Sequence, residues 1–99
     1  MTKQDSARSV RWTRQFKRDY QRERKGRHRN TIQIELAAVI RNLATDRPLE
    51  ARYRDHALSG PWGDCRDCHL RPDLVLIYRM HGPDMLELVR LGSHSELEL

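Results

Sequence analysis

The first half of the chain has the hydrophobic spacing of helices, after one short stretch that favours a strand. Residues 8–13 (RSVRWT) are short and β-prone, so we expect an edge strand there. A helix is expected over residues 14–24, in which Phe16 and Tyr20 lie four positions apart and therefore share one face. Thr13 precedes this helix and can cap it.

A second helix is expected after Gly26, which breaks the first. It begins at Asn30 or Thr31, and Gln33 stands where a capping box with Asn30 would need it. Pro48 ends it. The apolar positions recur with helical spacing and predict one buried stripe, formed by Ile32, Leu36, Val39, Ile40 and Leu43.

The second half of the chain changes to the spacing of strands. After a loop with Gly and Pro at residues 49–64, strands are expected over 64–71, 73–80 and 85–94, with a turn at HGPD between the last two. The order β-α-α-β-β-β predicts an α+β fold, in which two helices pack on a small, curved antiparallel sheet. A length of 99 residues suits one domain, so we expect a single domain over 1–99.

Charge is concentrated near the N-terminus. The formal net charge is +5, and between residues 8 and 29 only Asp19 and Glu23 oppose a run of cationic side chains. A field of this sign attracts polyanions, and arginine suits forked contacts with phosphate. A solvated helix face or an acidic protein partner would explain the same run. The cationic residues are Arg8, Arg11, Arg14, Lys17, Arg18, Arg22, Arg24, Lys25, Arg27 and Arg29.

Neither a membrane span nor an export signal is expected. The sequence has no apolar run near the length of a spanning helix, and the N-terminal residues have no apolar segment typical of a secretory signal. We therefore expect a cytoplasmic protein with reduced thiols and no membrane contact.

Residues 65–69 read Cys-Arg-Asp-Cys-His, a spacing found in haem attachment sites, redox dithiols and zinc sites. On a strand, Cys65, Asp67 and His69 share one face, and Cys68 points to the other. A covalent haem needs both thiols on one side, and zinc needs two further ligands where no second cysteine pair exists. We interpret the spacing as incidental and expect no cofactor and no metal.

Three histidines and one aspartate are better candidates for chemistry. His56 lies in the loop, His69 and Asp73 lie at the ends of neighbouring strands, and His94 ends the last strand. A meander can bring all four to one face. Two groups that titrate near neutral pH can act as base and acid while a ribose 2′-OH attacks the adjacent phosphorus. This pattern therefore favours RNA cleavage without a metal, giving a 2′,3′-cyclic phosphate.

Cationic side chains stabilise the negative charge that develops on phosphorus in such a reaction. The candidates near the histidines are Arg66, Arg71 and Arg90. Among the other residues, we expect Trp12 and Trp62 to pack, and Asp67 to pair with an arginine. Tyr78 is expected to face the core or a covering helix.

The motifs in this half of the chain resemble the YafQ-type toxins of the RelE/ParE superfamily over about residues 8–97. The matching pieces are a D-H-x-L-x-G-x-W loop, an R-D-x-H-x-x-P-D strand pair ending in Tyr-Arg, and R-x-G-S-H-x-x-L. In this sequence they are Asp55, His56, Leu58, Gly60, Trp62; Arg66, Asp67, His69, Pro72, Asp73, Tyr78; and Arg90, Gly92, Ser93, His94, Leu97.

The resemblance implies a ribosome-dependent mRNA endonuclease with a microbial-ribonuclease-like fold. It places the catalytic residues at His56, His69, Asp73 and His94. Within that set we expect His94 to be the general acid, His56 or Asp73 the general base, and His69 an orienting or electrostatic group. Glu98 departs from the pattern, because the family often has an aromatic residue there that suits stacking on a base.

The resemblance also implies partners. They are a cognate antitoxin, the mRNA, and 16S ribosomal RNA at the ribosomal A site. The complex with antitoxin is expected to bind operator DNA through the antitoxin. The basic helix is the expected contact for the ribosome or the antitoxin, through Arg14, Lys17, Arg18, Arg24 and Lys25.

Two other functions fit the same sequence. The first is a toxin of the same fold that inhibits gyrase and has no enzymatic activity, although such a protein has no need of the histidines. The second is a plain nucleic-acid-binding module, which would bind in a salt-dependent manner without cleaving.

Overall fold

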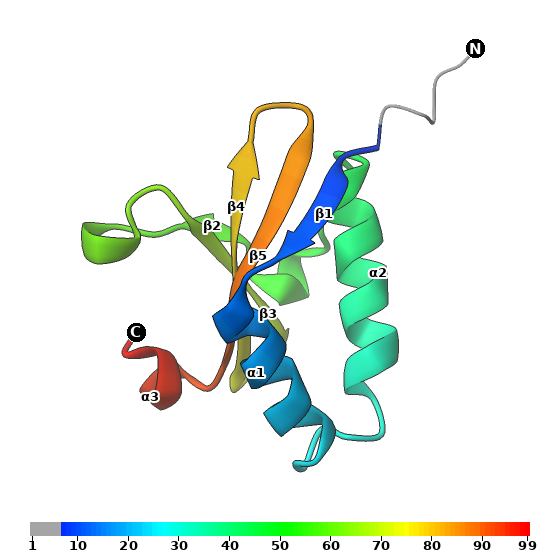
Figure 1. The fold of residues 1–99 in the computed structure, drawn as a ribbon, viewed down its shortest axis with the longest axis vertical. Helices are drawn as coiled ribbons and strands as arrows, with labels where there is room; N and C mark the ends of the chain where they lie inside the picture. The colour runs from blue at the N-terminus through cyan, green and yellow to red at the C-terminus, as the bar shows by residue number, and fades with distance from the viewer. Residues whose placement is uncertain (1–6) are drawn as a thin grey trace.

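The computed structural model of the protein describes residues 7–99. A five-stranded sheet with the order β1-β5-β4-β3-β2 forms its centre. Its strands are β1 (Ser9–Trp12), β2 (His56–Ala57), β3 (Arg66–Arg71), β4 (Leu74–His81) and β5 (Met85–Gly92). The helices are α1 (Arg14–Arg24), α2 (Ile32–Ala44) and the short α3 (His94–Leu97), with single 3₁₀ turns η2 (Ala51–Tyr53) and η3 (Gly60–Trp62). Figure 1 shows α3 on the other side of β5 from α2.

Helix α1 begins and ends where the sequence predicts. Thr13 is its N-cap, and the Thr13 hydroxyl accepts a hydrogen bond from the Phe16 N–H at 3.0 Å. The same hydroxyl donates to the Val89 carbonyl at 2.8 Å, which ties the start of α1 to β5. Trp12 anchors this corner, as expected, because its ring packs edge-on against Phe16 and Tyr20.

Helix α2 starts at one of the two predicted positions, but without the predicted capping box. Its N-cap is Thr31, whose side chain makes no capping hydrogen bond, so the expected capping box between Asn30 and Gln33 is wrong. Instead, the Ile32 N–H donates to the His28 carbonyl at 2.9 Å, so a backbone turn satisfies the end of the helix. The predicted stripe is buried at Ile32, Leu36, Val39 and Leu43 and half-buried at Ile40.

The antiparallel meander of β3, β4 and β5 is confirmed, but the whole sheet is mixed. Strand β1 runs parallel to β5, with Ser9 opposite Met85 and Trp12 opposite Leu88. This direction brings Thr13 to the middle of β5 and lets α1 pack beside the second half of that strand. The register of β5 against β4 shifts at Val89, because Ile77 is opposite Arg90 and Tyr78 is opposite Leu88. Val89 is therefore the extra residue of a β-bulge.

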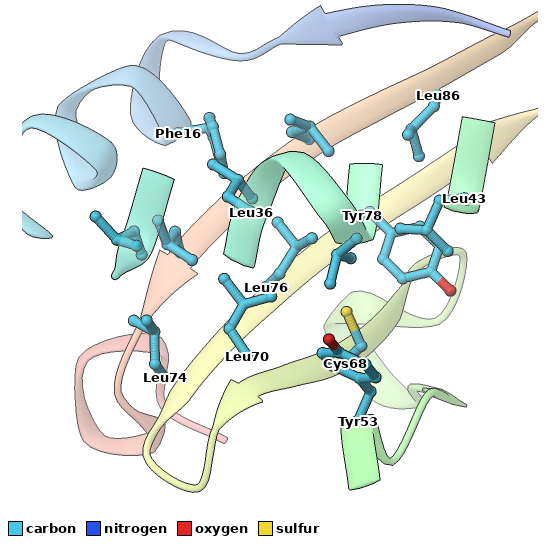
Figure 2. Close-up of a cluster of buried hydrophobic side chains, with 14 of the residues drawn as sticks. Phe16, Leu36, Leu43, Tyr53, Cys68, Leu70, Leu74, Leu76, Tyr78 and Leu86 are labelled. Carbon is cyan, nitrogen blue, oxygen red and sulfur yellow. The ribbon is translucent and has the colours of Figure 1, made fainter. Parts of the chain in front are cut away.

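The sheet has a different apolar cluster on each face. Helices α1 and α2 cover the larger cluster, and Figure 2 shows Phe16 and Leu36 in one group with Leu76 and Tyr78 of β4. The smaller cluster on the other face holds Cys65, Val75, Ile77, Val89 and Leu97, with Leu58 and Trp62 packed against it. Trp62 thus packs under its loop, as the sequence predicts. The thin cover of this second face leaves room for a polar site.

Leu76 tests how far the larger cluster stabilises the fold. The side chain is fully buried on the central strand β4. We expect Leu76→Ala to lower the free energy of unfolding by about 2–5 kcal/mol, the usual effect of removing a large core side chain. Ile34→Ala on α2 is the control, because Ile34 is 75% exposed and its loss should change stability by less than about 0.5 kcal/mol. Urea unfolding of both variants checks the prediction, and equal effects would contradict it.

Within residues 7–99, no helix is both long and apolar enough to cross a membrane. The two cysteines are free and buried, and they belong to the clusters on opposite faces of the sheet. The predicted alternation along β3 is therefore confirmed. The two thiols do not converge on one side of the strand.

Candidate active site

The candidate site is built on the sheet face that α1 and α2 leave uncovered. Cross-strand pairing places His56 of β2 opposite Asp67 of β3, Asp67 opposite Ile77 of β4, and Ile77 opposite Arg90 of β5. Residues directly opposite each other in antiparallel strands project from the same face. Register alone therefore aligns a histidine, a carboxylate and an arginine in one row across the sheet.

His69 and His94 lie beside this row. His69 is two positions after Asp67 on β3 and thus shares its face. The ring centroid of His69 is 5.1 Å from that of His94 and 6.5 Å from that of His56. The other two predicted histidines, His56 and His94, therefore lie on either side of His69 in the sequence and near its ring in space.

Helix α3, which the sequence analysis missed, places His94. Ser93 and Glu96 form a capping box, in which the Ser93 hydroxyl accepts from the Glu96 N–H at 3.1 Å and the Glu96 carboxylate accepts from the Ser93 N–H at 2.8 Å. His94 is the first residue of the helix. The S-x-x-E spacing of a capping box is visible in the sequence and predicts a helix start at this point.

Asp73 contacts His94 directly. One carboxylate oxygen accepts from the backbone N–H of His94 at 3.4 Å and lies 3.3 Å from its Nδ1. These contacts hold the pKa of the Asp73 carboxyl below its usual range, and the contact with the His94 side chain has the largest effect. The Asp73 carboxylate orients the ring through Nδ1, so that Nε2 points away from it. Asp73 is 51% exposed, so this contact is weakened by water.

Asp67 is a buried carboxylate at the centre of the histidines. It is 2% exposed, and its Oδ1 lies 3.0 Å from His56 Nδ1. That Nδ1 is also 2.8 Å from the Arg54 carbonyl, to which it donates its hydrogen bond. Oδ1 of Asp67 therefore has no hydrogen-bond donor among the described residues. The expected pairing of Asp67 with an arginine is therefore wrong. The alternation of β3 points Asp67 at the histidines and its neighbour Arg66 to the other face.

Burial and charge act in opposite directions on these groups. Burial raises the pKa of Asp67, while positive charge on His56, His69 and His94 lowers it. Burial also lowers the pKa of His69. The Asp67 carboxylate partly offsets this lowering, while His94, Arg54 and His56 add to it. His69 is consequently neutral over a wider range of pH than an ordinary histidine.

The titration of His69 can be tested by NMR of its ring. We expect a pKa below the ordinary 6.5, and a further fall in Asp67→Asn, because that variant removes the one negative charge that favours protonated His69. Arg54→Gln should move the pKa upward instead. The same shift makes stability depend on pH. His69 has its higher, ordinary pKa in the unfolded chain and binds a proton more readily there, so its contribution to folding stability is lost as the pH falls below that value. A pKa that rises in Asp67→Asn would contradict this account.

Arg90 is held by Asp19, a residue to which the sequence analysis gave no role. Asp19 is 3% exposed on α1, and its two oxygens accept from Arg90 Nε at 2.8 Å and Nη2 at 3.3 Å. The Leu91 N–H donates to Asp19 at 2.9 Å, and Arg22 Nη1 donates at 3.2 Å. A charged residue among the inward positions of an amphipathic helix is the signal that marks it in the sequence.

The three predicted phosphate-binding arginines have different surroundings. Arg90 lines the same hollow as His56, His69 and His94. Arg71 lies on the other side of His69 and pairs with Glu35 at 2.8 Å. The prediction for Arg66 is wrong in position, because Arg66 faces away from the histidines and donates to Asp55 at 3.3 Å, beside the Tyr78 hydroxyl. Tyr78 is buried against the larger cluster, as expected.

The hollow around the histidines has a volume of about 780 Å³. It is open to solvent and large enough for a nucleotide. Trp62 and Leu58 form part of its wall, and Glu98 and Leu99 line the side near α3. The position at which an aromatic residue was expected therefore does face the site, with Glu98 in its place. Within residues 7–99, no three histidine, cysteine or acidic side chains are placed to hold a metal ion together.

A basic face on α1 lies apart from the hollow. The five residues predicted to contact the ribosome or an antitoxin are all exposed, and none of them forms an ion pair within the described part of the chain. Arg24 lies over the Tyr20 ring at 5.7 Å. By contrast, Arg22 is used internally, since its Nη2 donates to the Leu91 carbonyl at 2.8 Å. The residues of this face are Arg14, Lys17, Arg18, Arg24 and Lys25.

Comparison with known proteins places the chain in a family. An mRNA interferase toxin YafQ from Escherichia coli strain K12 is 34% identical over 92 residues, which is 91% of this chain and 95% of that protein. The crystal structure of the E. coli DinJ-YafQ toxin-antitoxin complex aligns with a TM-score of 0.78 at 32% identity, covering 92% of this chain and 97% of the other. A metal-bound toxin from Helicobacter pylori aligns with a TM-score of 0.75 at 39% identity, covering 90% of this chain and 97% of that one.

The sequence profile of the bacterial toxins named YafQ, which act in type II toxin-antitoxin systems, matches residues 8–99. The match contains the whole sheet, all three helices and every residue of the candidate site. The α+β architecture and the family resemblance expected from the sequence are confirmed by these comparisons. The chain belongs to the YafQ family of bacterial toxins of type II toxin-antitoxin systems.

Proposed function

We propose that the protein is the toxin of a type II toxin-antitoxin system and cleaves mRNA on the ribosome. The observation that carries the proposal is the convergence of three histidines and a buried carboxylate with Arg90 around one open hollow. These groups can exchange protons near neutral pH and stabilise negative charge, which is what attack by a ribose 2′-OH requires. The similar E. coli protein is named an mRNA interferase toxin.

The contacts support a division of roles among the residues. His94 is the general acid that protonates the leaving 5′-oxygen, because Asp73 holds its Nδ1 and leaves Nε2 free to donate. The sequence offered His56 or Asp73 as the base and His69 as an orienting group. Because Asp73 is engaged by His94, we assign the base to His56 or His69, and the lowered pKa of His69 suits a group that must be neutral at the start. Asp67 stabilises the histidine that gains the proton. Arg90 balances charge on the phosphorus.

The partners follow from the same proposal. A cognate antitoxin silences the toxin, as the E. coli complex of the related protein indicates. The exposed basic face on α1 binds either the acidic segment of that antitoxin or the 16S ribosomal RNA of the A site. The antitoxin complex binds operator DNA through the antitoxin. The protein acts as one domain in the cytoplasm, where its ribosome is found.

Primer extension on a reporter mRNA in a purified translation system tests the function. We expect new 5′ ends at codon positions only when the protein is present and ribosomes translate. Intact mRNA together with inhibited supercoiling by gyrase would identify the gyrase-inhibiting alternative. Salt-dependent RNA binding without any new 5′ ends would identify a plain binding module.

Removal of metal ions tests the chemistry. Because the proposed acid and base are side chains, we expect that protein dialysed against EDTA and returned to chelator-free buffer cleaves at an unchanged rate. Elemental analysis of the same samples measures whether a metal was removed. A stoichiometric metal signal that disappears together with the activity, and returns with it on adding the metal, would contradict the metal-independent mechanism.

A further inference from the structure

We propose that Arg52, Arg54 and Arg71 form a subsite for a second phosphate of the RNA, next to the phosphate that is cleaved. The inference deepens the proposed function and rests on it. The three arginines line a hollow of about 410 Å³ together with His69, Leu70 and Pro72. No acidic side chain is among the residues that line this hollow.

The arginine hollow adjoins the larger hollow. His69 and Arg54 line both the arginine hollow and the larger hollow that contains His56, Arg90 and His94. A strand of RNA carries a phosphate at every nucleotide, so a strand whose scissile phosphate lies beside His69 brings an adjacent phosphate to one side or the other. The arginine hollow meets the larger one at His69, and His94 does not line it.

Two of the arginines are held in place by contacts that leave donors free. Arg71 binds Glu35 through Nε and Nη2, and Arg52 binds Glu50 through Nε at 3.0 Å. Arg52 also stacks over the Tyr53 ring at 4.3 Å. A guanidinium has five N–H donors, so a bond to one carboxylate leaves others for a phosphate. Anchored arginines lose less conformational freedom when they bind an anion.

Arg54 joins the subsite to the catalytic histidines. It follows η2 in the left-handed conformation, with φ of 51°, which is unusual for a residue with a side chain. Its carbonyl accepts from His56 Nδ1, and its side chain forms no ion pair with a carboxylate in residues 7–99. A phosphate bound by Arg54 would therefore also fix the loop that carries His56.

Phosphate is the ligand that fits this chemistry. Planar guanidinium groups bind phosphate oxygens in a forked manner, and contacts with phosphates set the register of a nucleic acid without reading its sequence. Register is what the reaction needs, because the 2′-OH must be aligned with the scissile bond. The subsite would supply this alignment from outside the histidine cluster.

The test uses oligonucleotides that the protein cannot cleave. Trinucleotides with 2′-O-methyl groups lack the attacking hydroxyl and carry two phosphates, and a neutral methylphosphonate can replace either one. Their affinities are measured by NMR titration of the whole chain. In the unmodified protein, we expect the trinucleotide whose subsite phosphate is neutralised to bind about tenfold more weakly than the fully charged trinucleotide. A loss of this size is typical of a charge-assisted contact.

Arg54→Gln and Arg71→Gln should each remove most of this difference in affinity between the charged and the neutralised trinucleotide. Arg41→Gln is the matched control, because it removes the same charge from an exposed position on α2 and should leave the difference unchanged. Two variants are used because Arg54 occupies an unusual backbone conformation and its replacement can alter the fold. If neutralisation has no effect in the unmodified protein, or weakens binding to both subsite variants as much as to the unmodified protein, the proposal is overturned.

The outcome separates this subsite from the proposed function. A protein that binds the neutralised trinucleotide more weakly, but leaves mRNA intact in the translation assay, would refute the nuclease and retain the phosphate subsite. A protein that cleaves mRNA but binds each modified trinucleotide as tightly as the fully charged one would retain the nuclease and refute the subsite.

Discussion

Replacing His94 with Gln lowers the rate of mRNA cleavage by roughly 10²- to 10⁴-fold, the usual contribution of a positioned acid or base. Gln has similar size and polarity but cannot give a proton to the leaving oxygen. The neighbouring Asp73 and the capping box of α3 remain, so the backbone at position 94 keeps its support. The measurement is single-turnover cleavage on stalled ribosomes, which separates the chemical step from ribosome binding.

The pH profile makes this prediction specific to the acid. A general acid must be protonated, so the activity of the unmodified protein falls at high pH as His94 loses its proton, and it falls at low pH as the base gains one. His94→Gln should lose the fall at high pH and keep the fall at low pH. Because the rings of His69 and His94 are 5.1 Å apart, the observed midpoints belong to the group as a whole.

His81→Gln is the matched control for His94→Gln. His81 is exposed at the end of β4, and its Nε2 lies 2.9 Å from a Glu87 oxygen. His81 lines neither hollow, so the variant should cleave at the normal rate. Undiminished cleavage by His94→Gln, or an equal loss in both variants, would remove His94 from the mechanism.

The elements of the fold were predictable where local chemistry determines them. Thr13 caps α1 because its hydroxyl reaches the Phe16 N–H, an interaction over three residues that sequence spacing reveals. Alternation along β3 placed Cys65 and Cys68 on opposite faces for the same local reason. The capping box at Asn30 was not confirmed, because a backbone turn from His28 satisfies that helix end first.

The features that depend on long-range pairing were not predictable. The parallel direction of β1 and the bulge at Val89 arise from packing between segments far apart in the sequence. The same applies to Asp67, for which an arginine partner was reasonable by charge alone. Only the register of β2 against β3 shows that His56 stands opposite it. Sequence therefore identified the histidines and Asp73, while the structure identified Asp67 beside His56 and Asp19 beside Arg90.

Asp19→Asn is expected to destabilise the protein by roughly 3 kcal/mol, at the lower end of the range for breaking a buried ion pair. The carboxylate accepts from Arg90, Arg22 and the Leu91 N–H, and the amide of Asn has one acceptor oxygen for these donors. The lower end applies because Arg22 and Arg90 keep some contact with water, with side chains 42% and 21% exposed. Urea unfolding measures the change, and Asp84→Asn in the exposed turn before β5 is the control.

A double-mutant cycle shows whether this effect passes through Arg90. If Asp19 chiefly fixes that side chain, Arg90→Gln should cost much less stability in the Asp19→Asn protein than in the unmodified one, because residues in one network are not additive. The same cycle applies to cleavage: without Asp19, Arg90 is free to leave the hollow, so the rate should fall while the binding of RNA changes less. Additive effects on both quantities would show that α1 merely supports β5, and that the position of Arg90 does not depend on Asp19.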